Sequence, residues 1–381
     1  MTQGAEVIII GAGVIGCSIA YHLAKLGCHD VIILEKQSIG SGSTSQCPGG
    51  IRQQFSTETN IRLSIESVDF FRRFEDETQH PADFRQYGYL MLAATEEESR
   101  LFQNNVALQR KLGVNVHLLS PEEIGEIVPG LNVKDVVSAT YCPDDGYADP
   151  YSVVQGFASV ARRLGVKIYE ETEVLDIKQH DGRNLLISSD KAEFSAPVTV
   201  IASGAHAAKV GQMVGIDLPI RPSRRHMFVS APLDEVRKDT PMVVDFHSGF
   251  WFRREGRGII FGMRNPDEPE GFDTSVDWGF LPSIGEVGSC YLPFLKEIGI
   301  ARGQAGLHAD TPDANAILGQ VPEVAGLYLA CGFSGHGFMH SPAVGRIMAD
   351  SILAGKVSPD ISCLTLDRFK DPTSQVEKSF I

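Results

Sequence analysis

Three glycines and one acidic residue near the N-terminus have the types and spacing that bind a dinucleotide phosphate. A strand-like run over residues 6–10 leads into Gly11, Gly13 and Gly16, and Glu35 ends a second apolar run nineteen residues after Gly16. Gly11 permits a tight turn, Gly13 lets a pyrophosphate approach the backbone, and Gly16 lets helix and strand pack closely. The N–H groups at the helix start bind phosphate charge, and Glu35 bonds the adenosine ribose. The pattern predicts a cofactor that contains ADP.

A strand–helix–strand unit over residues 6–34 must position these groups, and the sequence predicts one. Residues 14–26 have helical apolar spacing and stop at Gly27, which suits a helix end. A second helix is expected over residues 57–77. Capping sequences predict three further helices, which start after Thr95, Ser120 and Asp149.

Strands predominate in the later part of the chain. The segments 166–169, 173–179, 185–188 and 198–202 are expected strands, with Asp181-Gly182 as a hairpin turn. Residues 216–303 favour strands, and 225–229, 242–246, 250–254 and 258–263 are expected to form an antiparallel sheet with 87–93 and 138–142. A last core strand over residues 327–331 precedes a glycine-rich loop at 332–337, and Ser341-Pro342 is expected to start the final helix. A βα unit followed by a long insertion is closer to flavoproteins than to simple pyridine-nucleotide dehydrogenases.

Composition excludes several classes of protein. The 381 residues carry a net charge of −14, so a nucleic-acid partner is not expected. The seven cysteines are scattered without a CxxC pair, which argues against zinc and dithiol redox sites and favours reduced, mostly buried thiols in a cytoplasmic protein. No metal site, signal peptide or transmembrane segment is predicted, because no apolar run approaches the roughly 20 residues that span a bilayer.

Four further segments carry motifs of one known family. They are residues 40–45 with Gly49-Gly50, 200–205, 305–313 and, most specifically, Ala-Cys-Gly-Phe-Ser-Gly-His-Gly-Phe-Met at 330–339. From Glu6 to about Leu353 the chain resembles FAD-dependent oxidoreductases of the D-amino acid oxidase type, in the branch of glycine oxidase, sarcosine oxidase and the proline dehydrogenase β subunit.

The resemblance implies an α/β fold, α+β overall, with a Rossmann-like FAD-binding domain of glutathione-reductase type and an antiparallel-sheet substrate domain. The FAD-binding domain is expected to comprise residues 1–85, 144–215 and 304–365. The substrate domain is expected to comprise 86–143 and 216–303, with a C-terminal tail at 366–381. A helix starting at Ser341 would offer N–H groups to the negative charge of a reduced flavin.

The expected cofactor is non-covalent FAD. Relatives with covalent FAD use a cysteine where this chain has Gly306, and relatives with a second, covalent flavin use a histidine where it has Ala148. The residues that the motifs and the resemblance assign to FAD are Gly11, Gly13, Val14, Ile15, Gly16, Glu35, Lys36, Ser43, Thr44, Ser45, Gly49, Gly50, Ile51, Val174, Ser203, Gly204, Gly306, Gly332, Phe333, Ser334, Gly335, His336, Gly337, Phe338 and Met339.

An amino-acid substrate needs a fixed cation for its carboxylate, ideally a guanidinium. Arg52 is the first candidate, because it follows Gly49-Gly50 and resembles an arginine near the substrate in relatives; the alternative is that it only orders its loop. Arg264 ends a strand that faces the flavin in relatives. One of Arg224 and Arg225 is expected to be a solvated strand residue.

Two histidines are further catalytic candidates. His308 and His340 lie on the two loops expected to flank the flavin, where a histidine could bind a carboxylate, take a proton or close a hydrogen-bond network. His336 is expected to be structural. An apolar pocket wall could come from Trp251 with Phe246, Phe250 and Phe252, although a buried sheet face would place some of these in the core.

Three positions depart from the family pattern. The lysine that activates oxygen in monomeric sarcosine oxidase is replaced by Ile260, and its carboxylate-binding lysine by Met339. The arginine that binds the carboxylate in glycine oxidase is replaced by His308. Neither the electron acceptor nor the carboxylate anchor therefore follows directly from the resemblance.

The resemblance implies oxidation of the C–N bond of a small secondary or N-substituted amino acid, such as sarcosine, iminodiacetate, proline or glycine. Hydride transfer to flavin N5 would leave an imine, which water hydrolyses. The electron acceptor is O2 or a partner, and a homo- or hetero-oligomer is expected. One alternative is a flavin β subunit of a multi-subunit dehydrogenase; another is a non-catalytic assembly factor that retains FAD.

Overall fold

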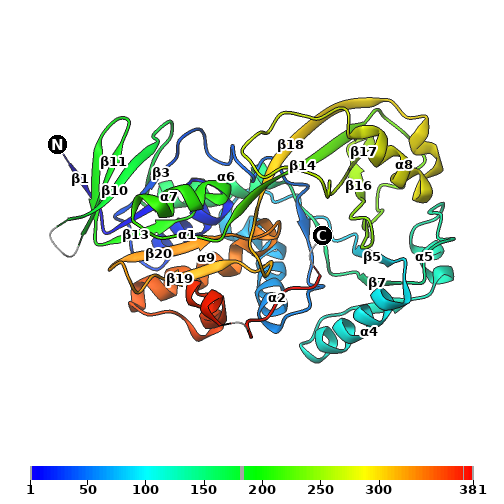
Figure 1. Ribbon diagram of the computed structural model, residues 1–381, viewed down its shortest axis with the longest axis horizontal. Coiled ribbons are helices and arrows are strands. Elements are labelled where there is room, and N and C mark those ends of the chain that lie inside the picture. The colour runs from blue at the N-terminus through cyan, green and yellow to red at the C-terminus, as the bar shows by residue number, and fades with distance from the viewer. Residues whose placement is uncertain (1, 181–183, 372, 380–381) are drawn as a thin grey trace.

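Two groups of elements lie side by side in the computed structural model, which describes residues 2–180, 184–371 and 373–379. Figure 1 shows one group around a six-stranded sheet, here called the nucleotide lobe, and another around an eight-stranded sheet, here called the sheet lobe. The chain passes between the lobes several times, so each lobe is built from separated segments. This agrees with the predicted combination of a Rossmann-like domain and a second, sheet-based domain.

The six-stranded sheet is the core of the nucleotide lobe. Its order is β19 (Ile317–Gln320), β20 (Leu327–Cys331), β13 (Val198–Ile201), β2 (Val7–Ile10), β3 (Val31–Leu34) and β9 (Lys167–Tyr169). All neighbouring strands are parallel except β19, which is antiparallel to β20. Strands β2 and β3 are fully buried, because both faces of the sheet are covered.

Helices cover one face of this sheet and a smaller sheet covers the other. Val7 and Ile9 pack into the cluster that contains α1 (Val14–Lys25), α6 (Pro150–Arg163) and α9 (Gly337–Ala354). The alternate residues Ile8 and Ile10 pack against the four-stranded sheet and against α7 (Ala207–Met213). That four-stranded sheet has the order β1 (Gln3–Gly4), β12 (Glu193–Ala196), β11 (Asn184–Ser189) and β10 (Val174–His180). The predicted turn at Asp181-Gly182 lies outside the described residues.

The eight-stranded sheet has the order β18 (Ile300–Asp310), β14 (Arg221–Ser230), β17 (Gly258–Met263), β16 (Trp251–Glu255), β15 (Met242–Asp245), β5 (Tyr89–Ala93), β7 (Ser138–Cys142) and β6 (His117–Leu119). It is antiparallel, as predicted, except that β5 and β15 run parallel. Helices α4 (Glu96–Lys111), α5 (Pro121–Ile127) and α8 (Leu281–Tyr291) belong to this lobe. Helix α8 was not predicted in a stretch expected to form strands.

Three expected boundaries need correction. The helix expected over residues 57–77 is two helices, α2 (Glu58–Arg72) and α3 (Phe74–Thr78). The boundary expected between residues 303 and 304 cuts β18, which pairs with β14 on both sides of that point. Parts of the expected C-terminal tail are ordered against the rest of the chain: η4 (Leu366–Lys370) follows η3 (Pro359–Leu364), and Glu377 and Ser379 are each 2% exposed.

Both predicted capping boxes are present, at Thr95 and Ser120. In the first, the Glu98 carboxylate accepts hydrogen bonds from the backbone N–H groups of Ala94 and Thr95 at 2.9 and 3.0 Å. Its second oxygen lies 2.9 Å from Nδ1 of His247, in the loop between β15 and β16. This hydrogen bond raises the pKa of His247 above its ordinary value.

We expect Glu98→Gln to lower the His247 pKa to about 6.5, its ordinary value. Because the folded-state pKa of His247 is raised, its stabilisation is complete below pH 6.5 and is lost as the pH rises through the folded-state value. The His247 side chain is 62% exposed, so the contribution stays below about 1 kcal/mol. Titration of the His247 ring by NMR measures the shift. Glu97→Gln, on the exposed neighbour, is the control; an unchanged His247 pKa in Glu98→Gln would contradict the assignment.

All seven cysteines are free thiols, and four of them are buried. Within the described residues, no helix is long and apolar enough to cross a bilayer. No group of three metal-ligating side chains occurs in that part of the chain either.

Candidate active site

A single cavity of about 600 Å³ extends from the glycine turn of the nucleotide lobe to the inner face of the eight-stranded sheet. Its wall at one end contains Gly11, Gly13 and Glu35, and at the other end Tyr89 and Trp251. A cavity of this size suits a small organic ligand or cofactor. The cavity thus joins the predicted nucleotide site and the predicted substrate domain.

The glycine turn has the geometry that its sequence predicts. Gly11 has φ of +110°, and a Cβ there would lie 2.6 Å from the carbonyl oxygen of Ala202. A Cβ on Gly16 would lie 2.0 Å from the carbonyl oxygen of Gly11, so only glycine lets α1 start this close to the turn. Gly13 lines the cavity, where the backbone is open to a phosphate.

Glu35 lies at the end of β3, where its carboxylate also orders the turn. One oxygen accepts a hydrogen bond from the Ala12 N–H at 2.8 Å, and the other accepts one from the Gln37 N–H at 2.9 Å. Beside it, Lys36 Nζ lies 2.8 Å from His206 Nε2, and both side chains line the cavity. The acidic group is therefore fixed at the place where an adenosine ribose would bind.

The prediction that the final helix starts at Ser341 is wrong by one turn. Helix α9 begins at Gly337, and Pro342 lies inside it. Pro342 has no N–H group to donate to the carbonyl oxygen of Phe338, four residues earlier in the helix. The Ser341 hydroxyl donates a hydrogen bond to that oxygen instead, at 2.8 Å, so proline is tolerated at this position. The first turn of α9 thus brings Gly337, Phe338 and Met339 to the cavity wall.

Most residues assigned to the cofactor line this cavity. The exceptions are Gly16, which packs beneath the turn, Ile51, which is fully buried in β4 (Gly50–Ile51), and Ser45, whose hydroxyl bonds the carbonyl oxygens of Ser41 and Gly42. The members that line it are Gly11, Gly13, Val14, Ile15, Glu35, Lys36, Ser43, Thr44, Gly49, Gly50, Val174, Ser203, Gly204, Gly306, Gly332, Phe333, Ser334, Gly335, His336, Gly337, Phe338 and Met339.

Gly306 has no space for a side chain. A Cβ at this position in β18 would lie 2.4 Å from Cβ of Gln46 and 3.0 Å from its carbonyl oxygen. A cysteine could not occupy position 306 without moving the Gln46 loop.

Arg52 lies in the cavity wall, is 4% exposed and directs its guanidinium towards neutral groups. Nη2 donates a hydrogen bond to the carbonyl oxygen of Ser379 at 2.6 Å, and Nη1 donates to that of Gln54. The guanidinium Cζ also lies 3.9 Å from the ring centroid of Phe55. Burial lowers the pKa of Arg52, yet a guanidinium stays protonated at neutral pH. A buried positive charge held by neutral carbonyls attracts an anion.

Arg224 and Arg225 form ion pairs, and each side chain is only 13% exposed, so the expectation that one is solvated is wrong. Arg224 pairs with Glu268 at 2.7 Å and does not line the cavity. Arg225 lines the cavity, and its Nη2 lies 3.3 Å from an Asp310 carboxylate oxygen. Its charge is thus partly balanced by a direct ion pair, whereas the described hydrogen-bond partners of Arg52 are neutral and the carboxylates of Glu377 and Asp145 act on it only from a distance.

His308 and Arg264 both line the cavity at the sheet end. His308 lies in β18, not in a loop, and Nδ1 is 3.7 Å from the Asp310 carboxylate. Burial and, secondarily, the positive charges of Arg225 and Arg264 lower the pKa of His308 well below its ordinary value. His308 is therefore neutral at pH 7 and does not supply a cation.

His340 lies inside α9, 1% exposed and outside the cavity wall, so the expectation that it lies on a loop flanking the flavin is wrong. Its Nε2 lies 2.9 Å from the Ser64 hydroxyl, and its ring centroid lies 4.9 Å from that of Phe55. The earlier start of α9 places His340 one turn into the helix, where it packs behind the cavity. His336 does line the cavity.

Of the four aromatic residues proposed for a pocket wall, only Trp251 lines the cavity. Phe250 and Phe252 are buried in the core of the sheet lobe, because that face of the sheet packs against helices. Sequence reasoning missed several wall residues of this end: Tyr89, Met242, Val244 and Met263. They come from three strands that are distant in sequence, so no local motif marks them.

The fold and the cavity define a flavin-dependent oxidoreductase, and the chain belongs to that family. The family pattern described as "DAO: FAD dependent oxidoreductase" matches residues 6–351. FAD is the cofactor of this family, and the open backbone at Gly13, the fixed Glu35 and the size of the cavity fit it.

Solved structures and curated relatives agree with this family. L-proline dehydrogenase from P. horikoshii has a TM-score of 0.91 and 34% identity, covering 99% of this chain and 100% of that one. Glycine oxidase from Geobacillus kaustophilus has a TM-score of 0.85 and 27% identity, covering 96% and 99%. Mitochondrial dimethylglycine dehydrogenase from Rattus norvegicus is 30% identical over 385 residues, which is 96% of this chain and 45% of that protein. This chain thus spans about half the length of the dimethylglycine dehydrogenases that it matches.

Proposed function

We propose that this protein oxidises the C–N bond of a small secondary or N-substituted amino acid, with FAD as the electron acceptor in its cavity. The observation that carries the proposal is Arg52, a buried cation in the wall of the cofactor cavity. In the part of the chain that the structure describes, its guanidinium bonds two neutral carbonyl oxygens and lies over one ring, and it has no direct ion pair. Such a group is a receptor for a carboxylate. The names of the relatives agree, since proline, dimethylglycine and glycine are all amino acids with small side chains.

The residues of the nucleotide lobe would hold the cofactor without a covalent bond. Gly13 and the start of α1 would bind the pyrophosphate, Glu35 the ribose, and the first turn of α9 the flavin. The lack of space at Gly306 supports non-covalent binding. When bound, FAD accepts a hydride from the carbon next to the substrate nitrogen.

The sheet lobe would bind the amino acid. Arg52 would bind the carboxylate, and Trp251, Tyr89 and Met242 would exclude water from the reacting carbon. Arg264 would contribute positive charge at the same end. Neutral His308 would act as a hydrogen-bond partner, not as a cation.

The electron acceptor and the partners belong to the same proposal. Ile260 stands where the resemblance places the oxygen-activating lysine of monomeric sarcosine oxidase, and the absence of that lysine supports a partner protein or quinone over O2. We also propose a cytoplasmic location and a homo- or hetero-oligomer, without nucleic acid. The seven free cysteines support a reducing compartment.

Anaerobic titration of the yellow protein tests this function. Proline, sarcosine, dimethylglycine, glycine and iminodiacetate are added in turn, and the flavin absorbance is followed. We expect at least one of them to bleach the flavin, with slow recolouring in air that a redox dye accelerates. Fast recolouring in air would identify an oxidase instead. A flavin that none of these amino acids reduces, although dithionite does, would favour the non-catalytic assembly factor.

A further inference from the structure

The segment 375–379, here called the strap, buries the side chains of Glu377 and Ser379 against elements of both lobes. It lies against the N-terminus of α2, and Figure 1 shows the red C-terminal part of the chain passing α2 towards the sheet lobe. The strap contacts both lobes: Glu377 bonds Asn60 of α2, and Ser379 bonds Asn105 of α4. This segment belongs to the expected C-terminal tail, residues 366–381.

Glu377 anchors the strap. Its carboxylate accepts six hydrogen bonds: from the N–H and hydroxyl groups of Ser56 and Thr57, from the Asn60 amide and from the Ser379 N–H, at 2.6–3.2 Å. Thr57 is the N-cap residue of α2, but its own side chain does not cap the helix. Glu377 therefore supplies the negative charge that the start of α2 favours, from more than 300 residues away in sequence.

The strap ends in a contact with Arg52. The Ser379 carbonyl oxygen accepts a hydrogen bond from Nη2 of Arg52. The backbone N–H of the same residue, Ser379, donates to the Glu377 carboxylate at 2.8 Å. Asn105 holds the Ser379 hydroxyl at 3.2 Å. Because a carbonyl is neutral, it orients the guanidinium and satisfies a donor without cancelling the positive charge.

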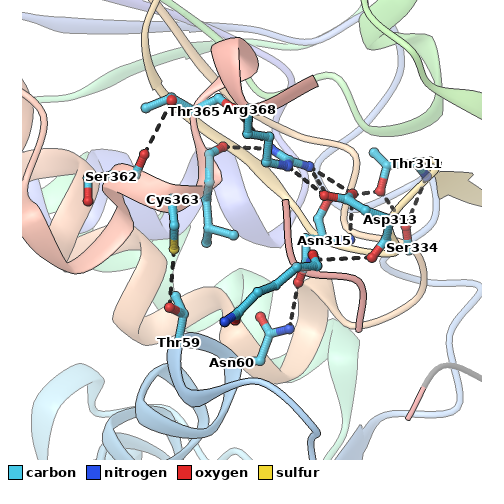
Figure 2. Close-up of polar contacts among 12 residues, drawn as sticks. Thr59, Asn60, Thr311, Asp313, Asn315, Ser334, Ser362, Cys363, Thr365 and Arg368 are labelled. Carbon is cyan, nitrogen blue, oxygen red and sulfur yellow. Dashed lines mark hydrogen bonds and ion pairs between the residues drawn. The ribbon is translucent and has the colours of Figure 1, made fainter. Parts of the chain in front are cut away.

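A buried polar network connects the strap to the cofactor loop. Figure 2 shows Asn60 bonded to Asn315, whose neighbour Asp313 forms a two-point ion pair with Arg368 at 2.7 and 3.0 Å. Asn315 also donates to the Gln375 carbonyl oxygen at the start of the strap, and its own carbonyl accepts a hydrogen bond from Thr311. Thr311 in turn bonds Ser334 in the glycine-rich loop. The strap is thus part of the rigid surroundings of the cavity, not a loose end.

We propose that the strap positions Arg52 for the substrate carboxylate and that Glu377 is the positioning residue through which it acts. The inference rests on the proposed function, because it assigns the strap to the same carboxylate site. Arg52 lines the cavity, and described residues accept from two of its five N–H donors, while Phe55 and the two carbonyls hold the plane of the guanidinium. Removing the anchor frees this plane to rotate, which weakens binding in both the ground state and the transition state.

The test compares Glu377→Gln with the unaltered holoprotein under steady-state turnover of the amino acid that bleaches the flavin. A glutamine amide keeps one acceptor oxygen but places an NH2 group where the other oxygen accepted, so about half of the six hydrogen bonds that anchor the strap are lost. We expect KM to rise about tenfold with kcat within about twofold, the pattern of lost uniform binding. In an Arg52→Ala background the same substitution leaves KM unchanged, because the strap acts through Arg52.

Two further variants keep the test decisive. Glu323→Gln removes an exposed carboxylate that pairs with Lys370 on η4, and it is the control expected to leave KM unchanged. Ser379→Ala removes only the contact with Asn105, and we expect KM to rise about threefold, in keeping with one lost hydrogen bond. If Glu377→Gln does not fold, Ser379→Ala decides the matter.

The outcomes separate this inference from the proposed function. If the protein is active and KM is unchanged in both Glu377→Gln and Ser379→Ala, the proposed role of the strap is wrong, while the proposed function stands. A lower KM in Glu377→Gln also contradicts the proposed role, because the strap would then hinder substrate binding instead of supporting it. An equal rise of KM in the Arg52→Ala background shows an effect that does not pass through Arg52 and overturns it as well. If no amino acid reduces the flavin and acetate does not perturb its spectrum, the proposed function and the strap fail together.

Discussion

Gly16→Ala is expected to yield a protein that does not retain FAD. The added Cβ would lie 2.0 Å from the carbonyl oxygen of Gly11 and 3.2 Å from Cγ2 of Ile9, so either the turn or the start of α1 must move. A shift of about 1 Å at the phosphate-binding N–H groups removes their alignment, and overpacking a buried contact costs about 1–3 kcal/mol or more. Because this turn also holds β2 against α1, we expect a lower melting temperature together with the loss of cofactor.

The ratio of flavin to protein absorbance in purified material measures this effect. Gly285→Ala is the matched control: Gly285 lies in α8, no atom lies within 4 Å of the added Cβ, and alanine is the better helix former. The control should stay fully yellow and melt at the same temperature or slightly higher. A Gly16→Ala protein with a full complement of FAD would contradict the close packing described here.

Arg52→Ala is expected to lower kcat/KM for the amino-acid substrate by about a hundredfold or more, as removal of a charged partner from a desolvated ion pair does. The flavin should remain bound, since the nucleotide lobe holds most of the cofactor. Arg52→Lys keeps the charge but loses the two-point geometry and the ring contact with Phe55, so we expect an intermediate loss.

Turnover of an amino acid and of its amide separates the two roles left open for Arg52. If Arg52 binds the carboxylate, the variant discriminates less between proline and prolinamide than the unaltered protein does. If Arg52 only orders its loop, both substrates lose activity in the same proportion. Arg62→Ala, which removes an exposed ion pair with Glu58, is the control for a lost surface charge.

The nucleotide lobe could be predicted from sequence because its signals are local. The turn at Gly11–Gly16, the strand before it and the acid after it lie within about 30 residues, and each has a specific physical requirement. The capping boxes at Thr95 and Ser120 were predicted for the same reason, since a cap and its partner are three residues apart. The strands β7 and β20 were predicted to the residue.

The substrate end could not be predicted in the same way, because it depends on contacts between distant segments. Pro342 pointed to a helix start, but the Ser341 hydroxyl and the packing of Gly345 against Ser18 of α1 stabilise an earlier one. His340 was consequently placed at the cavity and lies behind it. The strap was missed altogether, since nothing near Glu377 indicates that its partners are residues 56–60. Only the assembled fold brings these groups together.

The strand order of the nucleotide lobe affects how the chain can fold during synthesis. Strand β13 lies between β2 and β20, and α1 is covered by α9, so the central sheet is complete only when residues 7–10, 198–201 and 327–354 have all left the ribosome. Until then β2 has only β3 as its neighbour in the sheet, and the face of α1 that packs on α9 is uncovered. Contacts this distant in sequence make folding slow and expose the nascent chain to aggregation. We therefore expect chaperones, or early binding of the flavin nucleotide, to raise the yield of correctly folded protein.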